Sequence, residues 1–109
     1  MTMKATIFQD PEGRPTGFRI LGHAGYAEKG KDIVCSAVSA LATTAVNAIQ
    51  TFTDDPVETE TVDEEKGLLE FRLKTVSEGS KLLLDSLVLG LQDIQKSYGR
   101  YLSIRFEEE

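Results

Sequence analysis

Cys35 is the only cysteine and His23 the only histidine in this chain of 109 residues, and twelve positions separate them. A thiol and an imidazole held close together are the minimum equipment for nucleophilic catalysis by cysteine. Asp32 is a good helix N-cap, so Cys35 is expected in the first turn of a helix. There, unpaired N–H groups and the helix dipole favour a thiolate and would also hold an oxyanion. Residues 22–39 are therefore the candidate active site.

Less specific interpretations of Cys35 and His23 stay open on residue types alone. A lone cysteine on the apolar side of a helix is most often a small buried side chain, and a lone histidine after a strand is most often a loop residue. A structural zinc site would lack two ligands unless carboxylates or a second subunit supplied them. Ser39, one turn after Cys35, is either a small packing residue or a hydroxyl that supports the site.

Alternating and helical spacings of apolar residues predict the elements that must position this pair. In chain order these are strands at 4–8 and 16–21, a helix from Asp32 to Gln50, strands at 56–63 and 68–75, a helix at 80–98 and a strand at 101–107. Hairpins separated by helices indicate an α+β fold in the order ββαββαβ. We expect a two-layer sandwich, with a mainly antiparallel sheet and two helices on one face, in a single domain over residues 1–109.

This arrangement places a loop beside the site, and it leaves one face of the sheet uncovered. The segment 22–31 contains three glycines and no clear period, which is typical of a mobile loop over a site. The apolar strand residues that are candidates for the uncovered face are Phe8, Phe18, Leu69 and Phe106. If they point there, a second copy of the chain is the simplest cover, so the pattern predicts a homodimer.

The composition narrows the classes of partner and compartment. Eighteen acidic and twelve basic residues give a formal charge of -6, which disfavours nucleic-acid binding and suits a basic partner. One cysteine cannot form an internal disulfide, and the first residues show no signal peptide, so we expect a cytoplasmic protein. Every apolar run is interrupted within a few positions, so we expect no membrane segment. The acidic residues at 54–65 are expected to form a solvated hairpin and secondarily to attract a basic substrate.

Two short motifs carry a resemblance to a known family. The tripeptide at 22–24 (GHA) and the run at 32–39 (DIVCSAVS), separated by a glycine-bearing loop, resemble the signature of the ribosomal-processing cysteine proteases called Prp. Chain length, the order of elements and the place of the motifs agree with that family, so the resemblance covers essentially the whole chain. Ser36 stands where the family more often has alanine, which exchanges one small residue for another.

The resemblance implies a homodimeric cytoplasmic endopeptidase that needs no cofactor or metal. Members of that family remove the N-terminal extension of the precursor of large-subunit ribosomal protein twenty-seven, a basic protein, by cutting after a phenylalanine. The implied site residues are the nucleophile Cys35, the general base His23, the supporting residues Asp32 and Ser39, and the loop residues Gly22 and Gly30. The alternative function is a non-catalytic ribosome-assembly module that binds the same protein without cutting it.

Overall fold

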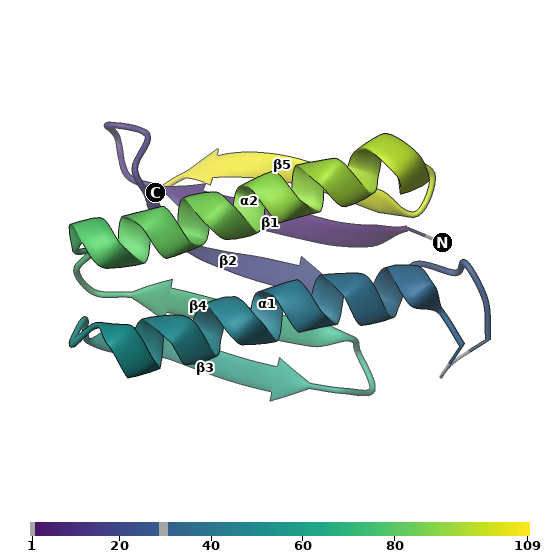
Figure 1. The fold of residues 1–109 in the computed structure, drawn as a ribbon, viewed down its shortest axis with the longest axis horizontal. Helices are drawn as coiled ribbons and strands as arrows, with labels where there is room; N and C mark the ends of the chain where they lie inside the picture. Colours follow the sequence, from purple (N-terminus) through teal and green to yellow (C-terminus); the bar gives the residue numbers. More distant parts are fainter. Residues whose placement is uncertain (1, 29–30) are drawn as a thin grey trace.

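Residues 2–28 and 31–109, which the computed structural model describes, form strands and helices in the predicted order ββαββαβ (Figure 1). The elements are β1 (Met3–Gln9), β2 (Pro15–Leu21), α1 (Ile33–Phe52), β3 (Val57–Asp63), β4 (Leu68–Leu73), α2 (Glu78–Tyr98) and β5 (Leu102–Glu108). The candidate active-site motifs thus lie at the end of β2 and at the start of α1.

The strands form a five-stranded sheet in the order β3-β4-β2-β1-β5. The pairs β1–β2, β2–β4 and β3–β4 are antiparallel, and β1–β5 is parallel. Both helices cover the same face of the sheet and lie in front of it in Figure 1. The predicted α+β two-layer sandwich with a mainly antiparallel sheet is confirmed. The polar strand β3 lies at an edge of the sheet.

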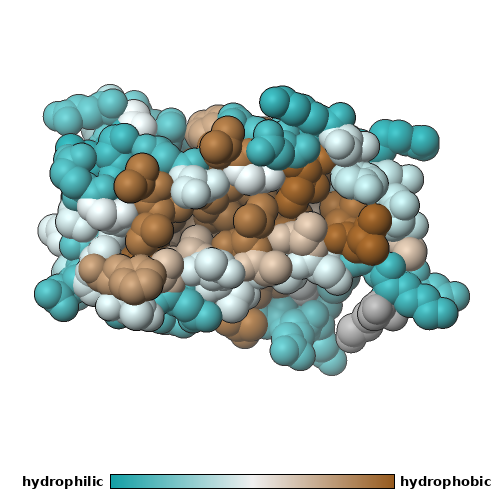
Figure 2. Space-filling model, viewed as in Figure 1, coloured by the Kyte–Doolittle hydropathy of each residue, from teal (hydrophilic) through white to brown (hydrophobic). Residues whose placement is uncertain are grey.

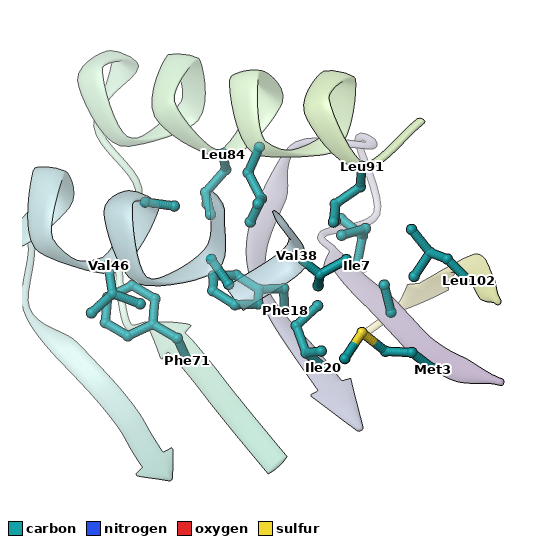
Figure 3. Close-up of a cluster of buried hydrophobic side chains, with 14 of the residues drawn as sticks. Met3, Ile7, Phe18, Ile20, Val38, Val46, Phe71, Leu84, Leu91 and Leu102 are labelled. Atoms are coloured by element: carbon teal, nitrogen blue, oxygen red, sulfur yellow. The ribbon is translucent and has the colours of Figure 1, made fainter. Parts of the chain in front are cut away.

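The hydrophobic core lies between the sheet and the helix layer (Figure 3). Side chains alternate between the two faces of a strand, so every second residue of the central strands points toward the helices. Phe18 and Phe71, on neighbouring strands, pack with their ring centroids 6.1 Å apart. The helix residues labelled in Figure 3 are Val38, Val46, Leu84 and Leu91. Because β2 and α1 are both anchored in this core, the end of one and the start of the other are held in fixed positions.

Helix α1 begins with Asp32 as its N-cap, as predicted. Its twenty residues include no charged side chain, and among the described residues it is the one helix long and apolar enough to cross a membrane by length and composition. The expectation of no membrane segment, which rested on interrupted apolar runs, did not take the length of this helix into account. Its buried side nevertheless packs against the sheet as in a core helix, through Val34, Val38, Ala42, Ala45, Val46 and Ile49.

Helix α2 begins two residues earlier than predicted, because Ser77 caps it. The Ser77 hydroxyl accepts a hydrogen bond from the Ser80 N–H at 3.3 Å. Gly90, which weakens an isolated helix, has a packing reason here. A Cβ at this position would lie 2.8 Å from Leu41 Cδ1 of α1, so the glycine allows the two helices to approach closely.

The sheet face opposite the helices is not the apolar surface that the sequence suggested. Phe18 belongs to the core, and Leu69 and Phe106 lie in register with helix-facing residues of the neighbouring strands. These three residues therefore point toward the helix layer. Phe8 alone of the four candidates points to the open face, because it alternates with the core residue Ile7.

Phe8 is fully buried on that open face, and side chains of the same chain cover it. The guanidinium of Arg72 lies 3.6 Å from the ring centroid and that of Arg19 lies 5.2 Å away. Glu70 accepts hydrogen bonds from both arginines, at 2.7 and 3.1 Å, and the bond from Arg19 holds the pKa of Glu70 below its ordinary value. This charged network removes the reason for covering the open sheet face with a second copy.

Candidate active site

The end of β2, the start of α1 and the turn between β3 and β4 surround a cavity of about 410 Å³. The predicted site residues that line it are Gly22, His23, Cys35 and Ser39. Asp32 does not line the cavity but is buried at the start of α1. Gly30 lies outside the described residues. The fold therefore brings the thiol and the imidazole to one cavity.

The rest of the cavity lining contains residues that the sequence interpretation did not assign to the site. Met3, Ile20 and Ala42 are buried apolar side chains, whereas Asp63 and Glu64 are more exposed and acidic. The remaining lining residues are Thr43, Val62, Gly67, Leu68 and Leu69. The acidic hairpin, which we expected to be a solvated surface, thus contributes a wall of the site. Its residues are distant in sequence from the motifs, and no local pattern links them.

The Asp32 carboxylate connects the helix start to the loop that follows β2. One oxygen, Oδ1, accepts hydrogen bonds from the N–H groups of Val34 and Cys35, both at 3.0 Å. The other, Oδ2, accepts from Tyr26 at 3.0 Å and from Ala27 at 3.4 Å. Burial alone would raise the pKa of Asp32, but these hydrogen bonds outweigh it and hold the pKa below its ordinary value. Asp32 is therefore a charged anchor for both parts of the site.

The Cys35 sulfur is half-buried beside this anchor and accepts a hydrogen bond from the Ala24 N–H at 3.2 Å. Burial raises the pKa of the Cys35 thiol, and the Asp32 carboxylate raises it further through its charge and a hydrogen bond. The Ala24 N–H opposes these effects without cancelling them. Both effects favour the protonated thiol, so a base beside it would assist its activation.

The helix start does not supply the free N–H groups that the sequence suggested for an oxyanion. Val34 and Cys35 donate to the side chain of Asp32, and Ser36 donates to its carbonyl oxygen at 3.0 Å. An acidic N-cap occupies these donors and also offsets the positive end of the helix dipole. The expectation that these N–H groups are free to hold an oxyanion is therefore wrong for Val34, Cys35 and Ser36.

His23 is the second residue after the end of β2 and follows Gly22. Gly22 has a φ of +93°, and its N–H donates to the carbonyl oxygen of Gly67 at 3.1 Å. Within the described part of the chain, His23 and Cys35 share the cavity without a hydrogen bond between them. Hydrogen bonds of catalytic groups are often long in the absence of substrate and shorten when it binds.

Tyr26 packs against the end of α2 and the turn that precedes β5, at the same end of the molecule as the start of α1 (Figure 1). Its ring packs edge-on against Tyr98 at 5.6 Å and against Tyr101 at 5.2 Å between centroids. Together with the Asp32 hydrogen bonds, these contacts hold the backbone that carries the Ala24 donor. The aromatic residues near the C-terminus were not part of the sequence hypothesis, because nothing local relates them to the loop.

Across residues 2–28 and 31–109, no three side chains of His, Cys, Asp or Glu lie in a group that could hold a metal ion. The polar side chains that line the cavity supply a thiol, an imidazole, two hydroxyls and two carboxylates.

Known proteins resemble this chain in both sequence and fold. The family model for cysteine protease Prp matches residues 2–103. The chain belongs to the Prp family. Ribosomal processing cysteine protease Prp of Staphylococcus aureus (strain Mu50) is 30% identical over 108 residues, which cover 98% of this chain and 99% of that protein. The protein of the same name from Bacillus subtilis (strain 168) is 28% identical over 102 residues, which cover 88% and 89%.

The fold of a solved Prp structure agrees with this placement. Crystalline Prp from S. aureus, in complex with a covalently linked product peptide, has a TM-score of 0.90 with this chain at 28% identity. The alignment covers 97% of this chain and 100% of the S. aureus chain. As a member of the Prp family the chain is a cysteine peptidase.

Proposed function

We propose that this peptidase removes the N-terminal extension of the precursor of large-subunit ribosomal protein twenty-seven, with Cys35 as nucleophile and His23 as general base. The observation that carries the proposal is that the single cysteine and the single histidine of a cysteine peptidase line the same cavity. The S. aureus and B. subtilis relatives are named ribosomal processing proteases, which supports a ribosomal protein as substrate.

In the proposed reaction His23 takes the Cys35 proton as the sulfur attacks the scissile carbonyl carbon. His23 then gives this proton to the leaving amine, and water hydrolyses the resulting thioester. The raised pKa of Cys35 supports a transfer that accompanies attack, rather than a thiolate formed in advance. Ala24 N–H, which donates to the sulfur, is our candidate donor to the oxyanion in place of the occupied helix-start groups.

The cavity supports a cut after an apolar aromatic residue of a basic substrate. Its volume of about 410 Å³ falls within the usual range of ligand sites, about 300–1,000 Å³. Buried Met3 and Ile20 offer an apolar surface to a phenylalanine side chain. Asp63 and Glu64 on the same lining, and the formal charge of -6, favour the approach of a basic protein. We place this activity in the cytoplasm, where a lone thiol stays reduced.

Peptide cleavage tests this function directly. We expect the protein to cut the N-terminal peptide of the precursor once, after the phenylalanine, with the products read by mass spectrometry. A matched peptide with alanine in place of that phenylalanine should be cut at least about tenfold more slowly, because the apolar contact is lost. If the full-length precursor binds but stays intact, the protein is a binding module and the proposed function is wrong.

We further propose that the protein is a homodimer, joined through the helix layer rather than the open sheet face. The two helices border a groove of about 500 Å³ lined largely by small and apolar residues, among them Ala40, Leu83 and Gly90. Figure 2 shows an apolar band over this helix face with hydrophilic side chains around it. Leu82 and Leu89 of α2 are 70% and 61% exposed. Projecting leucines and a hollow on one apolar face suit a two-fold interface between identical surfaces.

Sedimentation analysis of the protein and two variants tests this interface. We expect Leu89→Lys to convert a dimer at micromolar concentration into a monomer, since the lysine would place a charge in an apolar interface. Val62→Lys is the matched control, because Val62 on β3 is 65% exposed but lies away from the helix groove. A wild-type monomer, or a Leu89→Lys dimer, would refute the proposed interface.

A further inference from the structure

We propose that the turn between β3 and β4 is a positioning element of the active site, and that Gly67 is the residue that lets it hold the His23 imidazole in place. This inference rests on the proposed function, because it concerns the histidine that we assign as the general base. Gly67 is a positioning residue in this proposal, since it would act through His23 rather than on the substrate.

The contact between Gly67 and the histidine segment leaves no room for a side chain. Gly67 has a φ of +63°, a backbone conformation that favours glycine. A Cβ added to it would lie 2.5 Å from the carbonyl oxygen of Gly22 and 3.1 Å from Cε1 of His23. The first of these atoms is backbone, so relief of the clash requires the Gly22–His23 segment or the turn to move. The backbone of Gly67 thus lies directly beside the His23 imidazole and limits where the ring can lie.

Strand pairing explains why this contact is well defined. Residue Ile20 of β2 pairs with Leu69 of β4, and two residues further along, the Gly22 N–H donates to the Gly67 carbonyl oxygen at 3.1 Å. The antiparallel ladder therefore continues in register to Gly22. His23 leaves the sheet one residue later, at the point where the ladder ends, and its backbone is held there by the hairpin.

The turn itself is supported on its other side. Gly67 N–H donates to the carbonyl oxygen of Glu64 at 3.2 Å, and Lys66 N–H donates to Asp63 Oδ1 at 3.2 Å. These bonds close the turn across the end of the β3–β4 ladder. The same turn brings the carboxylates of Asp63 and Glu64 to the cavity that contains His23 and Cys35. One short hairpin turn would thus set both the place of the base and the charge around it.

The other hairpin turn contains a matched control. Gly13, between β1 and β2, has a φ of +83°, and a Cβ there would meet nothing within 4 Å. Gly13→Ala and Gly67→Ala therefore both place an alanine at a positive φ, but only the second introduces a clash with the histidine segment. A difference in function between the two variants isolates the contact with His23 from the general effect on stability.

The single histidine and the single cysteine give two readouts that need no substrate. The His23 Cε1–H resonance reports the environment and titration of the imidazole, and the rate of Cys35 alkylation against pH reports the thiol. We expect Gly67→Ala to shift the His23 resonance, to alter its titration and to lower kcat for peptide cleavage by about 10- to 100-fold. Gly13→Ala should leave all three quantities at wild-type values.

A combination with His23→Ala separates positioning from structural damage. If Gly67 acts through the imidazole, Gly67→Ala should change the alkylation profile in the wild type and have no further effect in the His23→Ala background. Gly67→Asn also adds a Cβ, but asparagine tolerates a positive φ, so this variant replaces Gly67→Ala if the alanine variant does not fold.

A wild-type kcat and histidine titration in the folded variant would overturn the proposal. Loss of activity in Gly13→Ala to the same degree would overturn it as well. Full cleavage by His23→Ala would instead refute the proposed function.

Discussion

Replacement of Cys35 by serine is expected to lower kcat for peptide cleavage by about 10⁴-fold or more, because no other thiol in the chain can attack the substrate. His23→Ala should lower kcat by about 10²- to 10⁴-fold, the range for loss of a general base. The base matters here because burial and the Asp32 carboxylate raise the pKa of Cys35. Initial rates with the precursor peptide, followed by mass spectrometry, measure both effects.

Ser36→Ala is the matched control for these two variants. Ser36 is adjacent to Cys35 and exposed, and its replacement leaves the backbone hydrogen bond to Asp32 intact. We expect wild-type cleavage by Ser36→Ala and unchanged far-ultraviolet circular dichroism for all three variants. Cleavage at the wild-type rate by a folded Cys35→Ser or His23→Ala protein would exclude that residue from the proposed pair.

Loss of the Asp32 side chain is expected to have the second largest effect, on both stability and activity. Asp32→Ala should lower the free energy of unfolding by about 2–4 kcal/mol, since a helix cap contributes about 0.5–2 kcal/mol and each buried donor left unpaired costs about 1–3 kcal/mol. The buried donor concerned is the N–H of Val34, and the less buried N–H groups of Cys35, Tyr26 and Ala27 lose the same acceptor. Urea unfolding of the wild type and variant measures the difference.

Asp32→Asn separates the charge of this residue from its role as a cap. Asparagine still accepts from the helix start through one oxygen but presents an amide where Oδ2 now accepts from Tyr26 and Ala27. Because the carboxylate raises the pKa of Cys35, its neutral replacement should lower that pKa and speed alkylation near neutral pH. Peptide cleavage should nevertheless be slower, since the loop loses its anchor. A variant with unchanged alkylation and unchanged cleavage would contradict this role.

The pH dependence of stability provides an independent check on Asp32. The pKa of Asp32 is lower in the folded protein than in the unfolded chain. Its ionised form therefore stabilises the fold fully at a pH above the pKa in the unfolded chain. This contribution is lost as the pH falls through the pKa in the folded protein. The stability difference between wild type and Asp32→Asn should therefore shrink below about pH 4, near the ordinary pKa of aspartate. Urea unfolding at a series of acidic pH values measures it, and a constant difference would contradict the assignment.

Local patterns in the sequence predicted most of the fold. Apolar alternation, as in Phe18 and Ile20, and helical spacing after Asp32 depend on neighbours a few residues apart, so the strands and helices and their order are readable without tertiary information. The same holds for the Asp32 cap, which the structure confirms. The two residues missed at the start of α2 come from the cap at Ser77, which precedes the apolar stripe.

Only the part of the site that lies within short sequence motifs was predictable from the sequence. The motifs at 22–24 and 32–39 carry His23 and Cys35, and the fold brings both to one cavity. The sequence assigned the helix-start N–H groups to an oxyanion, whereas Asp32 occupies those of Val34 and Cys35. A cap and an oxyanion site need the same donors, and spacing alone cannot show which of the two takes them.

Tertiary structure decided the contacts between residues far apart in the chain. The pairing of β2 with β4 places Gly67 beside His23, and α1 and β3 intervene between these strands in sequence. Likewise, Phe8 is covered by Arg72 from another strand, so its face of the sheet needs no partner. The chain encodes such contacts through the relative placement of whole elements in a shared core. Local spacing determines which face of each element is apolar, but only packing of all the elements determines what each face meets.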